Sequence, residues 1–152
     1  MIKQLMQEGN CNELHMQYDN ESGCTFIIAL NTVYGDKGNG GTRMLQYSSI
    51  DEAISDATAL VGVMTKKCVM IGKKYNGGYS GGKGVIVGNP ATQKTPEMLR
   101  RYGTFVQTLN GRFQTGTDMN INLEDIKYVA EKSDFVYGLE VGLGDTAIPT
   151  AH

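Results

Sequence analysis

The chain has 152 residues, of which 14 are Lys or Arg, 16 are Asp or Glu and 40% are hydrophobic. A net charge of −2 without a basic block argues against a nucleic-acid partner, and no apolar run reaches the roughly 18 residues of a membrane span. The N-terminus lacks the apolar stretch of a secretory signal, and the three cysteines form no CxxC pair, so we expect a cytoplasmic protein without a metal site.

The length predicts a single domain over residues 1–152. Glycine takes 20 positions whereas proline takes 3, and 14 of the glycines fall in four clusters at 35–41, 77–84, 111–116 and 138–144. Glycine is favoured where the backbone turns with positive φ or approaches another group closely. The clusters therefore predict loops that gather around a site.

The first half of the chain predicts a pair of strands followed by a central helix. After a short N-terminal helix, strands are expected at 15–19 and 24–33, and a further strand at 41–47. The central helix begins with a capping pattern at Ser49, continues with helically spaced apolar residues and ends near 68–72.

The second half predicts short strands that alternate with helices. In chain order we expect a loop at 73–82, a strand at 84–87, a helix at 96–110, a strand end and loop at 113–118, a helix at 123–132 and a strand at 135–137. This alternation predicts an α/β fold of three layers, in which a mixed, mostly parallel sheet is flanked by helices.

The segment 76–84 carries the strongest local signal, because its glycines leave Lys83 without neighbouring side chains on its own loop. The lysine ammonium can therefore point into a cleft that a ligand shares with backbone N–H groups. The segment satisfies the GxxxxGK pattern of a phosphate-binding loop, but Gly84 follows in place of Ser or Thr, and a strand follows in place of a helix. A surface hairpin with a solvated lysine is the other alternative.

Lys67 near the end of the central helix and Asp118 after a predicted strand are further candidates. Cations at a helix C-terminus and aspartates in turns also occur without any function. Ligand sites in open α/β sheets lie beyond the carboxyl ends of strands, so both groups can meet Lys83 at one edge. One ammonium would hold a carboxylate, the other would have a lowered pKa, and the aspartate would relay protons, which suits a small amphoteric substrate.

Five motifs occur in the order found in amino-acid dehydrogenases: NGGTRM (39–44), MTKK (64–67), GGKG (81–84), KTPEM (94–98) and TD (117–118). From about residue 12 onward the chain resembles the glutamate/leucine/phenylalanine/valine dehydrogenase family, and especially its leucine and phenylalanine branch. The resemblance implies NAD-dependent oxidative deamination of an L-amino acid to a 2-oxo acid and ammonia, by a homodimer or larger homo-oligomer.

The same resemblance implies roles for individual residues. Lys67 corresponds to the lysine that binds the substrate α-carboxylate, Lys83 to the catalytic lysine that activates water, and Asp118 to its acid/base partner. The other substrate-binding residues that it implies are Asn39, Gly40, Gly41, Met44 and Gly116.

In this family a second, Rossmann-type domain binds NAD, and residues 144–152 resemble the hinge into that domain. No GxGxxG motif follows a predicted strand, so we expect this chain to hold no dinucleotide and to lack the nucleotide-binding domain. The chain is then the substrate-binding and oligomerisation domain of a dehydrogenase, incomplete as a catalyst. The alternatives are a stand-alone amino-acid-binding or interaction module, and a purely structural protein.

Asn39 stands where the resemblance places an apolar residue in branched-chain members and a lysine in glutamate members. Together with the small Gly116, it predicts a more polar or roomier pocket for the substrate side chain. We expect Asn39→Leu to change the preferred ligand in a binding series of L-amino acids, and an unchanged order of preference would contradict this hypothesis.

Overall fold

The computed structural model describes the backbone of residues 1–71 and 79–139, and the side chains of the same residues except 68–71. Its elements are α1 (Ile2–Glu8), β1 (Glu13–Tyr18), β2 (Thr25–Leu30), β3 (Lys37–Asn39), β4 (Thr42–Leu45), α2 (Ile50–Ile71), β5 (Tyr79–Val87), α4 (Pro90–Gln93), α5 (Pro96–Gln107), β6 (Phe113–Gln114) and α6 (Leu123–Ala130). None of these helices is long and apolar enough to span a membrane. The hinge-like residues 144–152 lie outside the described ranges.

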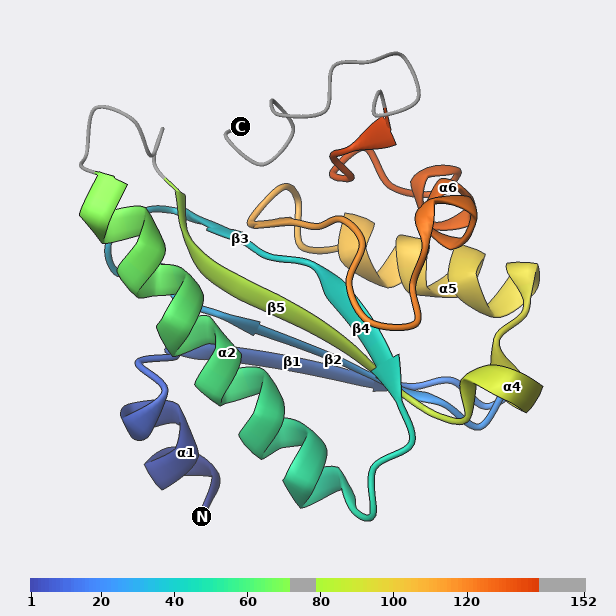
Figure 1. Cartoon of the computed structure of the whole chain (residues 1–152), viewed down its shortest axis with the longest axis horizontal. Helices are drawn as coiled ribbons and strands as arrows, with labels where there is room; N and C mark the ends of the chain where they lie inside the picture. Colours follow the sequence, from blue (N-terminus) through green and yellow to red (C-terminus); the bar gives the residue numbers. More distant parts are fainter. Residues whose placement is uncertain (72–78, 140–152) are drawn as a thin grey trace.

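One mixed sheet forms the middle layer of the molecule (Figure 1). The strand order is β1-β2-β5-β3-β6, and β4 also pairs with β5. The pairs β1–β2 and β2–β5 are antiparallel, whereas β3–β5, β4–β5 and β3–β6 are parallel. β3 and β4 therefore follow one another along the same edge of β5.

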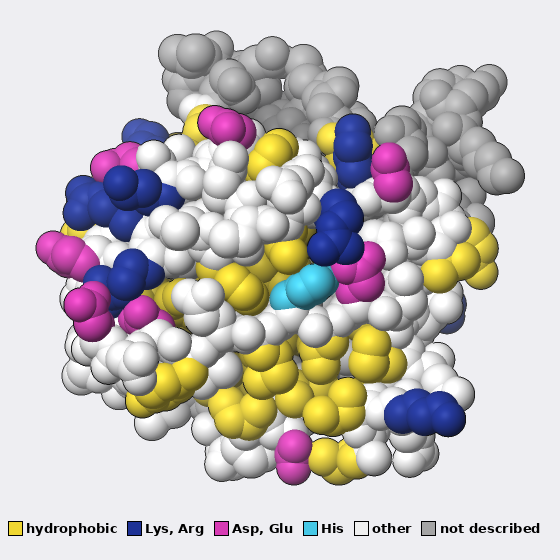
Figure 2. Space-filling view, turned by 180° about the vertical axis from the view of Figure 1, so that it is seen from behind, with side chains coloured by type: hydrophobic (Ala, Val, Ile, Leu, Met, Phe, Trp, Pro, Cys, Tyr) yellow, Lys and Arg dark blue, Asp and Glu magenta, His cyan; other side chains and the backbone are white. Residues whose placement is uncertain are grey.

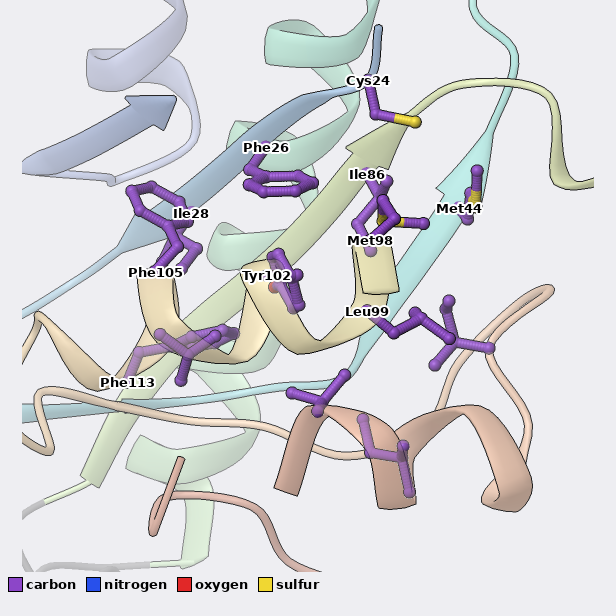
Figure 3. Close-up of a cluster of buried hydrophobic side chains, with 14 of the residues drawn as sticks. Cys24, Phe26, Ile28, Met44, Ile86, Met98, Leu99, Tyr102, Phe105 and Phe113 are labelled. Atoms are coloured by element: carbon purple, nitrogen blue, oxygen red, sulfur yellow. The ribbon is translucent and has the colours of Figure 1, made fainter. Parts of the chain in front are cut away.

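Helices cover both faces of this sheet, which confirms the predicted α/β class with three layers (Figure 1). On one face α2 packs apolar residues at helical spacing, Ala53, Ile54, Ala57 and Val61, against the sheet. On the other face α5 and α6 enclose a larger core that includes Phe26, Ile86, Tyr102, Phe105 and Phe113 (Figure 3).

The helix starts follow the predicted capping chemistry. Thr95 accepts a hydrogen bond from Met98 N at the start of α5, and Asn122 forms a reciprocal capping box with Asp125 at the start of α6. Such caps satisfy backbone N–H groups that the first turn of a helix leaves without partners. The helices therefore begin where the sequence predicts.

The loop predicted at 73–82 is wrong in its last part, because β5 begins at Tyr79; residues 72–78 lie outside the described ranges. The glycines of this strand bring it close to its neighbours. A Cβ on Gly81 would overlap Thr65 Oγ1 and the carbonyl oxygen of Val61 in α2, and a Cβ on Gly82 would lie 3.0 Å from the Phe113 ring. The glycines thus serve dense packing of a buried strand.

Two further differences concern short elements. β3 and α4 are absent from the prediction, since three and four residues give too short a periodic pattern. The strand predicted at 135–137 is reduced to a single bridge between Thr115 and Val136. Neither difference changes the class of fold.

Candidate functional site

Lys83 and Asp118, which lie far apart in the sequence, form an ion pair with 2.7 Å between Nζ and Oδ2. Lys83 projects from the middle of β5, and its side chain is only 8% exposed. Asp118 lies in the loop between β6 and α6, and its side chain is 29% exposed. The carboxylate therefore stands at the mouth of the site and the ammonium deeper inside it.

Arg43 of β4 binds the same carboxylate, with 2.7 Å between its Nε and Oδ2 of Asp118. Its Nη1 lies 3.2 Å from Oδ2 of Asp56 in α2, and the hydroxyl of Tyr47 donates to that same Asp56 oxygen. Two cations and two carboxylates thus form one network that joins β4, β5, α2 and the loop of Asp118.

The network shifts the protonation of its members. Burial lowers the pKa of Lys83, the charge of Arg43 lowers it further, and Asp118 opposes both effects. Burial alone would raise the pKa of Asp118, but the hydrogen bonds and charges of Lys83 and Arg43 hold it below its ordinary value. The site combines a lysine that loses its proton more readily than usual with a carboxylate that stays ionised.

Gly40 and Gly41 form the connection between β3 and β4 beside the ion pair. A Cβ on Gly40 would overlap the carbonyl oxygen of Gly82, and a Cβ on Gly41 would overlap that of Thr117 and lie 3.0 Å from Asp118 Cβ. Both glycines therefore allow the backbone to run directly against β5 and the loop of Asp118.

Lys67 is exposed near the end of α2, and among the described residues it makes no ion pair with a carboxylate. The segments that carry the two lysines are nevertheless joined, because Gly81 N donates to Thr65 Oγ1 over 3.2 Å. Lys67 lies two residues after Thr65, and Lys83 two residues after Gly81. The structure brings Lys83 and Asp118 together and leaves Lys67 outside their network.

Met44, which the resemblance makes a substrate-binding residue, lies on the other face of the sheet from the ion pair. Its side chain is fully buried in the core on the α5 face, together with Cys24, Ile86 and Met98 (Figure 3). Arg43, the next residue along the strand, points to the opposite face, as the period of a strand requires. Met44 thus packs in the core and lies away from the ion pair.

The ring of Tyr137 packs directly against Gly116. A Cβ on Gly116 would lie 2.6 Å from Tyr137 Cε1. Burial, together with the charge of Asp118, raises the pKa of Tyr137 to about 12. Asn39 is buried in β3, and its effect on ligand preference stays a prediction.

Sequence reasoning missed Arg43 and Asp56 as members of the network. A usable signal exists for Arg43, since a cation inside a strand with buried neighbours needs a partner. Asp56 carries no such signal, because a partly exposed aspartate on a helix is common. Its contact depends on how α2 crosses β4, which local patterns do not encode.

Among the described residues, no turn from a strand into a helix has the glycine-rich pattern of a dinucleotide site. The strand-to-helix turns of this part of the chain are 46–49, 88–89 and 115–122. The first contains no glycine, and the single glycine in each of the others lies against a side chain. A pyrophosphate is usually held by a glycine-rich turn that opens a helix.

We expect Asp118→Asn to lower the free energy of unfolding at pH 7 by roughly 2–4 kcal/mol, because two mostly buried cations lose their shared carboxylate. The pKa of Asp118 is lowered in the fold, so its contribution is complete above the ordinary pKa and is lost as the pH falls through the lowered value. Denaturant unfolding between pH 7 and about pH 2 should show that the free energies of unfolding of the variant and of wild type become more similar as the pH falls.

Glu131→Gln is the matched control, since it breaks the more exposed pair with Arg100. Its effect should stay within about 1 kcal/mol. Equal losses in the two variants at pH 7, or a loss in Asp118→Asn that does not change with pH, would contradict this assignment.

Known proteins with similar sequences are amino-acid dehydrogenases. Phenylalanine dehydrogenase of Thermoactinomyces intermedius is 44% identical over 134 residues, which are 86% of this chain and 36% of that protein. Leucine dehydrogenase of Bacillus subtilis strain 168 is 34% identical over 145 residues, 95% of this chain and 39% of that protein. This chain thus spans little more than a third of the curated relatives that it matches.

Among solved structures, L-tryptophan dehydrogenase from Nostoc punctiforme superposes with a TM-score of 0.82 at 33% identity, covering 95% of this chain and 43% of that one. A family model described as the dimerisation domain of Glu/Leu/Phe/Val dehydrogenase matches residues 12–135. The chain therefore belongs to the Glu/Leu/Phe/Val dehydrogenase family and corresponds to its N-terminal, dimerisation domain.

Proposed function

We propose that this chain is the substrate-binding part of an NAD-dependent L-amino-acid dehydrogenase, which deaminates an L-amino acid to a 2-oxo acid and ammonia. The contact between Lys83 and Asp118 carries the proposal. A lysine of lowered pKa beside an ionised carboxylate is the pair of groups that proton transfers at an amine and at a water molecule require.

The two residues would act at different atoms of the substrate. The Asp118 carboxylate accepts a proton from the substrate ammonium, which leaves a neutral amine. NAD supplies the hydride acceptor, and another part of the enzyme would hold it. Once the hydride has left the α-carbon, water attacks the imino carbon while the Lys83 amine takes one water proton and passes it to the nitrogen. The C–N bond then breaks as the hydroxyl proton passes to the Lys83 amine, which yields the 2-oxo acid and ammonia. Because Lys83 is mostly buried, its neutral amine is accessible at a lower pH than that of a solvated lysine.

Lys67 would hold the substrate α-carboxylate. Its ammonium is exposed, it is not committed to another carboxylate of the described residues, and it lies on the segment that Thr65 ties to β5. The relatives are named for phenylalanine, leucine and tryptophan, so L-amino acids with apolar side chains are the first ligands to test.

We further propose a homo-oligomer whose contact includes the edge strand β1. β1 pairs only with β2 among the described strands and carries the exposed apolar side chains of Met16 and Tyr18. Figure 2 shows hydrophobic side chains gathered on the back face of the molecule. An unpaired strand edge with apolar side chains favours pairing with another chain.

Cys11 and Cys24 are buried free thiols, which suits the reducing cytoplasm.

Ligand binding by the ¹⁵N-labelled chain tests the site directly. We expect L-phenylalanine, L-leucine and their 2-oxo acids to shift the amide NMR signals of Gly41, Lys83 and Asp118. Lys67→Gln should weaken binding by about tenfold or more, because a charge-assisted hydrogen bond to the carboxylate is lost.

Lys127→Gln is the control for this test, because Lys127 is an exposed lysine of α6 that pairs with Glu124. It should leave the affinity unchanged. Shifts that map elsewhere on the chain, or equal affinities of wild type and Lys67→Gln, would refute the proposed site.

The assembly can be measured by light scattering of the purified chain. We expect a mass of two or more chains, and a lower mass for Met16→Asp, which places a charge on the exposed edge strand. A monomeric wild-type chain at the highest measurable concentration would count against this interface.

A further inference from the structure

We propose that Arg43 is a positioning residue for the reaction: it holds one oxygen of Asp118 so that the other oxygen faces the substrate amine. This inference rests on the proposed function of the Lys83–Asp118 pair and adds to it a residue for which sequence reasoning gave no role.

Both cations of the network bind the same carboxylate oxygen. Lys83 Nζ and Arg43 Nε each lie 2.7 Å from Oδ2 of Asp118. No hydrogen bond from the described residues reaches Oδ1. Since the Asp118 side chain is partly exposed, Oδ1 is the oxygen left to exchange a proton with a ligand.

Arg43 is itself held in place from two sides. It lies on β4 opposite Val85 of β5, two residues beyond Lys83, and points to the α2 face of the sheet. There its Nη1 contacts Asp56, whose oxygen also accepts from Tyr47. The guanidinium fork thus bridges a rigid helix and the loop of Asp118, which the single ammonium of a lysine cannot do over the same span.

The charge of Arg43 affects the protonation of both Lys83 and Asp118. Facing this lysine from the surrounding elements are Arg43 on β4, Asp118 on its loop, Asp56 on α2 and, near Asp118, Tyr137. Arginine keeps its charge at every accessible pH. Its charge therefore keeps Asp118 ionised. The same charge repels the Lys83 ammonium and offsets part of the attraction of Asp118, which agrees with the lowered pKa of Lys83.

A purely structural salt bridge is the competing explanation. In that case the loss of Arg43 lowers the stability of the fold, but the titration of Lys83 and the binding of ligand stay as in wild type once the chain is folded. The two explanations therefore differ in a measurable quantity.

The test compares Arg43→Gln, Arg43→Lys and Asp56→Asn in the ¹³C-labelled chain, with the Lys83 Cε signal followed against pH. In Arg43→Gln we expect the midpoint of Lys83 to rise by about one pH unit, because a repelling charge is gone. Arg43→Lys should keep that midpoint near the wild-type value, because it retains the charge. Binding of L-phenylalanine or L-leucine should fall about tenfold in both, because neither side chain reproduces the fork.

Asp56→Asn removes the second anchor of Arg43 without touching Asp118, so it should weaken ligand binding less than Arg43→Gln does. Arg100→Gln is the control, since Arg100 pairs with Glu131 on the outer face of α5. It should change neither the Lys83 midpoint nor the affinity.

Unchanged midpoints and affinities in folded Arg43 variants, while Lys67→Gln still weakens binding, would overturn the role of Arg43 and leave the proposed function standing. If wild type binds no amino acid or 2-oxo acid, the proposed function itself fails. Should Arg43→Gln not fold, as judged by circular dichroism, Arg43→Lys and Asp56→Asn decide, because wild-type affinity in both refutes the proposal.

Discussion

Close cover of β5 on both faces is the constraint on which the site depends. Gly81 lies against the backbone of α2, and Gly82 lies against Phe113 on the opposite side. Between these layers the side chain of Lys83 is only 8% exposed, and its ammonium contacts Asp118. A buried cation needs a partner, so the packing of the strand and the placement of the carboxylate have to be satisfied together.

The charges of the site are balanced as a group. Lys83 and Arg43 oppose Asp118 and Asp56, and one carboxylate oxygen serves both cations. A partly buried environment strengthens these interactions relative to water. The proposed chemistry depends on this balance. When a proton leaves Lys83 or binds to Asp118, the electrostatic interactions of the other charged residues in the network change as well.

The layers, the main helices and the ion pair could be predicted from the sequence, because each has a local signature. Capping residues mark α5 and α6, apolar spacing marks α2, and the ordered motifs identify Lys83 and Asp118 through the family. What could not be predicted depends on how elements cross. A glycine-rich segment such as the one around Lys83 can form either a loop or a strand packed on both faces. Only the contacts with α2 and Phe113 show that it is a strand here.

Gly84, the residue after Lys83, packs against core residues on the α5 face of the sheet. On the α5 face, a Cβ at this position would overlap the hydroxyls of Tyr102 and Thr42, which are hydrogen-bonded to each other over 2.7 Å. A larger residue next to Lys83 therefore requires a smaller residue at position 102 or the loss of that hydroxyl pair. Positions 84 and 102 should therefore change together among homologues, although Tyr102 lies wholly within the interior.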